Sequence, residues 1–322
     1  MQPACADDVR FAVLLDRFVT PGPQKSGRPV WPLPEDLRLR YGGPLGFSPG
    51  ALIVNFVATL DGVTSFGEPD PGGGEVSGFN AADRFLMGLL RACADVVVIG
   101  ANTLRAEHPD YLWNSKSICP AQQASFAKLR CALGKPEEPA LVVVSQTGNL
   151  PLERAVFQSP PVVVLTTQTG AKRLGRPPTG VTVLSHGDAT YSGHTLATQL
   201  RTLAGNGVVL CEGGPQLLSA LYQARQVDEL FLTLAPQLAG RSPDCHRPAL
   251  VEGHAFSPKN APWLSLVGVR NAGEHLFLHY ATPGANKSPK GPAKRRPQRP
   301  EPIKAPKAQQ SAGRNAKTNE GR

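Results

Sequence analysis

The chain has 322 residues, of which 41% are hydrophobic, and its formal net charge at pH 7 is +9. This composition supplies a core for one large domain or two small ones, and no apolar run reaches the roughly 18 residues of a membrane-spanning helix. Residues 284–322 hold 11 Lys or Arg and two acidic residues, whereas residues 1–283 hold 23 of each sign. The charge therefore belongs to one end of the chain, and the neutral remainder argues against a nucleic-acid-binding surface there.

Residues 1–50 are rich in Gly and Pro, and we expect an extended N-terminal arm with a short amphipathic segment near residues 8–18. The first residues lack the basic start and apolar core of a secretion signal. The six cysteines contain no Cys-x-x-Cys pair, so we expect reduced thiols, no metal site and a cytoplasmic protein.

Residues 51–283 alternate between strand and helix patterns, which defines the predicted main domain. The predicted strands are 51–59, 95–99, 141–144, 162–167, 181–184, 208–211, 231–234, 264–269 and 275–280. One helix is expected to begin after Asn80 as N-cap, with Asp83 in the capping-box position, and others cover 195–203 and 216–225. Gly72-Gly73-Gly74 predicts a flexible loop.

Apolar strands between helices predict an α/β fold with a mostly parallel sheet, helices on both faces and an antiparallel C-terminal hairpin. Residues 284–322 are rich in Pro, Lys and Arg and have too few apolar side chains for a core, so we expect a disordered basic tail.

Polar, glycine-bearing segments follow three of the predicted strands. They are Thr59–Gly62, the Gly100–Thr103 segment that leads to Arg105 and Glu107, and Glu212–Pro215. Because the carboxyl ends of parallel strands meet at one edge, we expect these segments to form one ligand site. Taken singly, each is equally compatible with an ordinary turn or helix cap.

The Glu212–Pro215 segment has the clearest chemistry. Gly213 and Gly214 allow a ligand to approach the backbone closely, and Pro215 suits a first helical turn. The positive end of the following helix favours a phosphate or diphosphate. Glu212 is better suited to accept hydrogen bonds from a substrate.

These segments together resemble a known family, the reductase domain of bacterial riboflavin biosynthesis. The resemblance spans roughly residues 50–280 and rests on four motifs in order: Thr59-Leu60-Asp61-Gly62, residues 90–103, Cys211-Glu212-Gly213-Gly214-Pro215, and Val227-Asp228-Glu229-Leu230 with Ala235-Pro236 and Gly240. It implies a dihydrofolate-reductase-like fold and hydride transfer from NADPH to a ribosylamino-pyrimidine phosphate, in a protein that tends to be a homodimer.

The resemblance also implies roles for individual residues. Those expected to contact NADPH are Thr103, Glu107, Ser145, Gly213, Gly214, Pro215, Gln216 and Leu217. Arg91, Tyr111 and Glu212 are expected to face the substrate, and Asp61 and Glu212 are the candidate catalytic carboxylates.

Two departures from the family pattern leave alternatives open. The chain lacks the zinc deaminase signature of the bifunctional relatives, so we expect a stand-alone reductase. Residues 109–114 contain no arginine, where relatives carry one for the substrate phosphate, and Arg105 is the candidate replacement. A dihydrofolate-like or other planar substrate that stacks on Tyr111 or Trp113 is therefore one alternative. The others are an NADPH binder without turnover and weak nucleic-acid binding by the basic tail.

Overall fold

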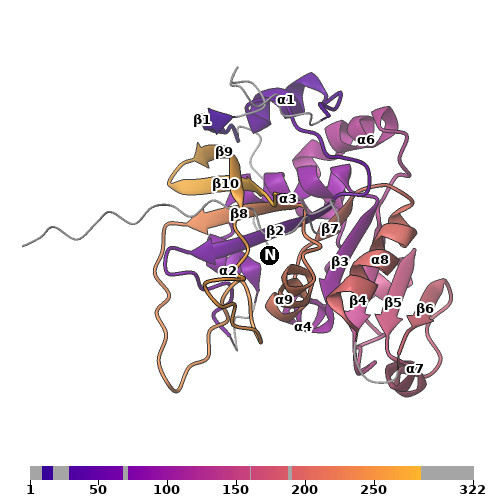
Figure 1. The fold of residues 1–322 in the computed structure, drawn as a ribbon. Helices are drawn as coiled ribbons and strands as arrows, with labels where there is room; N and C mark the ends of the chain where they lie inside the picture. Colours follow the sequence, from indigo (N-terminus) through magenta and orange to yellow (C-terminus); the bar gives the residue numbers. More distant parts are fainter. Residues whose placement is uncertain (1–8, 17–28, 68–71, 160, 188–190, 284–322) are drawn as a thin grey trace, which may run out of the picture. The chain divides into compact units, whose positions relative to one another are not determined.

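A computed structural model describes residues 9–16, 29–67, 72–159, 161–187 and 191–283, and these residues form a ten-stranded sheet (Figure 1). The strand order is β1-β9-β10-β8-β2-β7-β3-β4-β5-β6. The strands are β1 (Ala12–Asp16), β2 (Leu52–Thr59), β3 (Val96–Gly100), β4 (Ala140–Ser145), β5 (Val162–Thr166), β6 (Val181–Ser185), β7 (Val209–Cys211), β8 (Glu229–Ala235), β9 (Ser265–Ala272) and β10 (His275–Ala281).

The sheet is parallel from β8 to β6 and antiparallel from β8 to β1. β9 and β10 are the predicted C-terminal hairpin, and β9 extends beyond the predicted end to Ala272, so that the turn falls at Gly273 with φ of +57°. The predicted α/β fold class, with its mostly parallel sheet and antiparallel C-terminal strands, is confirmed.

Helices cover both faces of the sheet. They are α1 (Glu35–Tyr41), α2 (Gly73–Ser77), α3 (Ala81–Cys93), α4 (Ala101–Ala106), α5 (Ser115–Ile118), α6 (Gln123–Ala132), α7 (Gln168–Leu174), α8 (Gly193–Ala204) and α9 (Pro215–Gln223), with 3-10 turns at Pro120–Gln122 and Ala155–Gln158. The sequence pattern does not delimit α1, α2, α4, α5, α6 or α7, and Gly73 and Gly74, which were expected in a loop, lie in α2.

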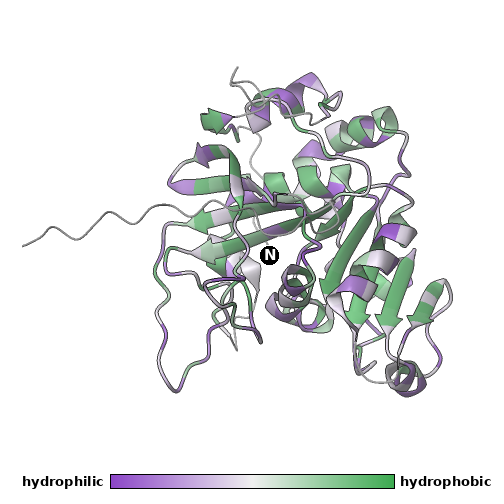
Figure 2. Cartoon of the chain, in the orientation of Figure 1, coloured by the Kyte–Doolittle hydropathy of each residue, from purple (hydrophilic) through white to green (hydrophobic). Residues whose placement is uncertain are grey.

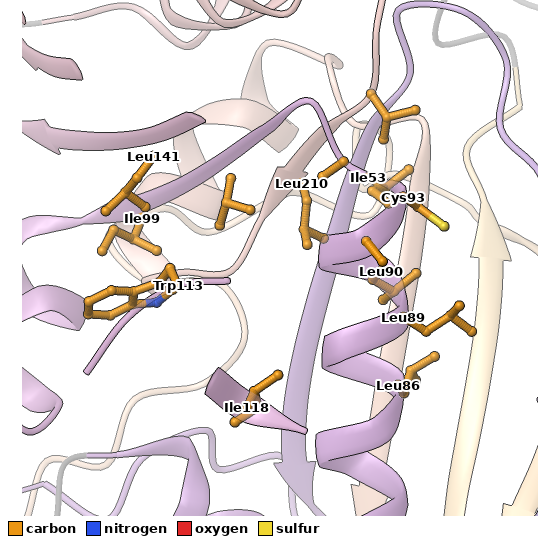
Figure 3. Packing of buried hydrophobic residues seen from close by; sticks show 14 of the residues in the cluster. Ile53, Leu86, Leu89, Leu90, Cys93, Ile99, Trp113, Ile118, Leu141 and Leu210 are labelled. Carbon is orange, nitrogen blue, oxygen red and sulfur yellow. The ribbon is translucent and has the colours of Figure 1, made fainter. Parts of the chain in front are cut away.

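Alternate residues of the central strands pack into two separate cores. Ile53 and Ile99 face α3 and α6, whereas Leu52 and Val98 face α8 and α9. The middle strands are accordingly hydrophobic along their length (Figure 2), and Figure 3 shows Ile53 and Ile99 with the apolar residues of α3. Each fully buried Leu or Ile contributes about 1.5–3 kcal/mol to folding, so burial on both faces explains the nearly unbroken apolar strands.

Helix α3 begins as the sequence predicts. Asn80 Oδ1 accepts hydrogen bonds from the backbone N–H groups of Ala82 and Asp83, at 2.9 and 3.0 Å. The reciprocal half of the predicted capping box is wrong. Asp83 Oδ1 instead accepts a hydrogen bond of 2.7 Å from Thr233 Oγ1 on β8, because α3 lies directly over that strand.

The described part of the predicted N-terminal arm contains a strand and a helix instead of an extended segment alone. β1 pairs with β9, and α1 contributes the buried Leu37 and Tyr41 to the core beside α3. Arg270 of β9 bonds Asp16 Oδ2 and the Tyr41 carbonyl oxygen, which ties both elements to the sheet. The rest of the arm and the tail from residue 284 lie outside the described residues. None of the described helices is long and apolar enough to cross a membrane.

Candidate active site

A cleft of about 1450 Å³ opens at the carboxyl ends of the parallel strands. Two of the three segments expected to form one site line it, Gly100–Thr103 after β3 and Glu212–Pro215 after β7, whereas Thr59–Gly62 after β2 does not. Every proposed cofactor contact lines it: Thr103, Glu107, Ser145, Gly213, Gly214, Pro215, Gln216 and Leu217. The candidate substrate residues Arg91, Tyr111 and Glu212 also line it. Asp61 does not.

One end of the cleft is formed by the N-terminus of α9. Gly214 is the N-cap and supplies no side chain to the helix end, and Pro215 occupies the first turn. The Leu218 N–H already bonds the Gly214 carbonyl oxygen, so the N–H groups of Gln216 and Leu217 are left for another acceptor. This helix end therefore offers two backbone donors and a positive partial charge to an anionic ligand.

Glycine is required at position 213 because the backbone there has φ of +130° and passes close to α4. A Cβ atom on Gly213 would lie 2.9 Å from Thr103 Oγ1, and one on Gly214 would lie 3.2 Å from the same atom. The Gly100 N–H bonds the Gly213 carbonyl oxygen at 2.9 Å. The segments after β3 and β7 thus meet directly at the floor of the cleft.

A buried polar network also lines the cleft, and it includes Glu212, the residue directly before Gly213. The side chain of Arg91 is fully buried, and that of Glu212 is 5% exposed. Arg91 Nη2 donates to Glu212 Oε2 at 2.7 Å and to the Tyr111 hydroxyl oxygen at 2.9 Å, while Nη1 donates to the Asn114 carbonyl oxygen at 3.2 Å. Burial raises the pKa of Tyr111 to about 12. Nε also donates to Glu212, so all three guanidinium nitrogens form hydrogen bonds within the protein. Arg91 therefore fixes the positions of Glu212 and Tyr111.

Residues 51–278 match the family model of the RibD C-terminal domain. The chain belongs to this family. No curated protein sequence matches the chain.

Three solved structures share the fold of this RibD C-terminal domain. A pyrimidine reductase-like protein from Corynebacterium diphtheriae is 20% identical, with a TM-score of 0.55 over 73% of this chain and 92% of that one. RibD from Acinetobacter baumannii is 23% identical, with a TM-score of 0.54 over 73% and 58%. A diaminohydroxyphosphoribosylaminopyrimidine deaminase/5-amino-6-(5-phosphoribosylamino)uracil reductase from Thermotoga maritima is 17% identical, with a TM-score of 0.53 over 73% and 57%. The chain thus spans under two thirds of the last two.

Asp61, expected as a catalytic carboxylate, does not line the cleft of this RibD C-terminal domain and is bonded within the protein. Its Oδ1 accepts hydrogen bonds from Thr59 Oγ1 at 2.5 Å and the Ala239 N–H at 3.1 Å, and its Oδ2 accepts one from the Gly240 N–H at 2.7 Å. These bonds lower the pKa of Asp61 to about 2. The carboxylate is ionised and holds the 239–240 turn, so it is poorly suited to relay a proton.

We expect the Asp61→Asn variant of this domain to lose stability relative to the parent chain at neutral pH but not at pH 2. A carboxylate whose pKa is lowered by folding stabilises the folded state above its ordinary pKa near 4, and this contribution disappears as the pH falls to about 2. Melting temperatures of both proteins between pH 2 and pH 7 measure the difference. A gap that stays constant across this range would contradict the assignment.

Two carboxyl groups inside the cleft have raised pKa values. Burial raises the pKa of Glu107, against the nearby Arg91, and burial likewise raises the pKa of Asp83, against its hydrogen bond from Thr233. Glu107 was expected on the cofactor side, and Asp83 was expected only in a helix cap. A signal for Asp83 was present, since Asp83, Met87 and Arg91 follow one another at intervals of four, and all three line the cleft.

Other lining residues of the cleft were missed because their segments carried no motif. Asn55 on β2 and Arg84 on α3 are both buried and line it, and Thr64 lines it too. Gly72–Gly74, expected as a loop that could lie over the site, also line the cleft. An asparagine in the middle of an apolar strand is a signal that could have found Asn55. Arg105 lines the cleft but donates to the Asn149 carbonyl oxygen and to Asn102 Oδ1. No group of three or more potential metal ligands occurs in the part of the chain that the structure describes.

Proposed function

We propose that this protein is an NADPH-dependent reductase that transfers a hydride to a ribosylamino-pyrimidine phosphate of riboflavin biosynthesis. The observation that carries the proposal is the single cleft that joins the uncapped α9 N-terminus to the Arg91–Glu212 wall. Membership of the RibD C-terminal domain family and the likeness to a pyrimidine reductase-like protein support it. A homodimer and a cytoplasmic location remain predictions.

The residues of one half of the cleft fit a dinucleotide. The Gln216 and Leu217 N–H groups suit its diphosphate, and the absence of side chains at Gly213 and Gly214 allows the close approach that this contact needs. Thr103 and the buried Ser145 would border the ribose and phosphate groups, with Glu107 beside them. When bound, NADPH supplies the hydride, and the protein supplies orientation and charge.

The other half of the cleft suits a planar substrate. Tyr111 lies in edge-to-face contact with Trp113, with ring centroids 4.8 Å apart, and its hydroxyl oxygen accepts from Arg91. Glu212, held by Arg91, is proposed to orient the substrate and to balance positive charge that develops on it. Glu107 and Asp83, whose pKa values burial raises, are better suited to hold a proton than Asp61, whose pKa is lowered.

A steady-state assay tests this function. The full-length protein is mixed with NADPH and 5-amino-6-(5-phosphoribosylamino)uracil, and the loss of NADPH absorbance is followed. We expect turnover with this compound and none with dihydrofolate. Turnover with dihydrofolate alone would replace the proposed substrate by the folate-like alternative, and inactivity with both despite NADPH binding would overturn the proposed reaction.

A further inference from the structure

Asn55 is a buried polar residue in the middle of an apolar strand. It lies between Val54 and Phe56 on β2, is 6% exposed and lines the cleft. Its Oδ1 has no hydrogen-bond partner among the described residues. A buried amide oxygen without a partner destabilises a fold, and an apolar residue of the same size would avoid this loss. Folding therefore gives no reason for an amide at this position, which points to a ligand.

The alternation of β2 places Asn55 on the α3 side of the sheet. Ile53, two residues earlier, packs in the core beside α3. Phe231 of β8, which pairs with Asn55 in the sheet, belongs to the same core. Thr233, two residues further along β8, donates to Asp83 of α3. Asn55 and Asp83 therefore lie on the same side of the sheet, on two different elements, and both line the cleft.

The chemistry of this pair selects a class of ligand edge. A primary amide presents a carbonyl acceptor and N–H donors in one plane, and rotation by 180° exchanges them. It therefore matches a ring edge on which a carbonyl and an N–H group are neighbours. The carboxyl of Asp83, whose pKa burial raises, is a second polar group, on α3, in the same cleft.

We propose that Asn55 is a substrate-specificity residue, which hydrogen-bonds the adjacent carbonyl and N–H groups of a planar uracil-type ring. This inference rests on the proposed function, because it concerns the substrate half of that cleft. The uracil-type ring is then recognised from β2, and the ribosyl phosphate is bound by other residues.

The test compares Asn55→Leu with Asn271→Leu. Asn271 on β9 also has an Oδ1 without a partner among the described residues, but it does not line the cleft, so its variant is the matched control. The dissociation constant of 5-amino-6-(5-phosphoribosylamino)uracil is measured by calorimetry without cofactor, and that of NADPH is measured separately by fluorescence. Melting temperatures verify that both variants are folded, and neither variant should melt below the parent chain.

We expect Asn55→Leu to weaken uracil binding about ten-fold and to leave NADPH binding within about two-fold, while Asn271→Leu changes neither. Unchanged uracil binding in Asn55→Leu, or a parent chain that does not bind the uracil compound, overturns the inference. Weaker NADPH binding also overturns it, since Asn55 would then contact the carboxamide of the cofactor. A parent chain that binds the uracil compound through Asn55 but does not oxidise NADPH contradicts the proposed function and supports the inference.

Discussion

Replacement of Glu212 by alanine is expected to lower the free energy of unfolding by about 3–5 kcal/mol. The Arg91 side chain is fully buried, and Glu212, at 2.7 Å, is the carboxylate that balances its charge. Without Glu212, the guanidinium keeps its hydrogen bonds to Tyr111 and Asn114, but its charge is buried and uncompensated. Urea unfolding followed by circular dichroism measures the change, and the loss of activity should accompany it.

A double variant separates the stability of this pair from its function. Arg91→Met with Glu212→Leu replaces both charges by apolar side chains of similar volume, which is often neutral or stabilising. We expect the double variant to unfold near the urea concentration of the parent chain and yet to lack NADPH oxidation with the uracil substrate. If Glu212→Ala alone unfolds like the parent chain, or if the double variant retains full activity, the role assigned to this pair is wrong.

The fold could be predicted largely because burial on both faces leaves a strong pattern. The strands β2 to β5 are apolar at almost every position, and each of their bounds lies within one residue of the predicted one. The short helices could not be predicted in the same way. Helix α2 begins at Gly73 and Gly74, which have low helix propensity, and the contacts of Gln237 Nε2 with the Glu75 and Val76 carbonyl oxygens are tertiary and invisible in the sequence.

The place of the site could be predicted from the strand ends, but the partners of its side chains could not. Sequence order puts Arg91 and Glu212 far apart, and the pattern does not reveal that they bond each other. The same limit applies to Asp61, whose hydrogen-bond partners could not be predicted. An Asp-Gly turn after a strand is compatible with a catalytic carboxylate and with a turn anchor, and the choice depends on the Ala239 and Gly240 N–H groups, which come from a distant loop.

Replacement of Gly213 by alanine is expected to weaken NADPH binding by at least about 30-fold, a loss of about 2 kcal/mol. The new Cβ atom would lie 2.9 Å from Thr103 Oγ1 at a backbone φ of +130°, so the Gly213 segment or α4 must move. Either movement displaces the start of α9, whose N–H groups are the proposed diphosphate contacts. The dissociation constant is measured by NADPH fluorescence.

Gly175→Ala is the matched control for this experiment. Gly175 also has a positive φ, of +70°, but a Cβ there meets no atom within 4 Å, and the residue ends α7 outside the cleft. The control therefore carries backbone strain without the contact with Thr103, and we expect it to lower the melting temperature while NADPH binding stays within about two-fold of the parent value. Equal losses of NADPH binding in both variants would mean that general destabilisation, and not the close contact of Gly213 with Thr103, lowers the affinity for NADPH. Unchanged binding in Gly213→Ala would remove the α9 N-terminus from the proposed site, because a diphosphate held by the Gln216 and Leu217 N–H groups is sensitive to displacement of that helix end.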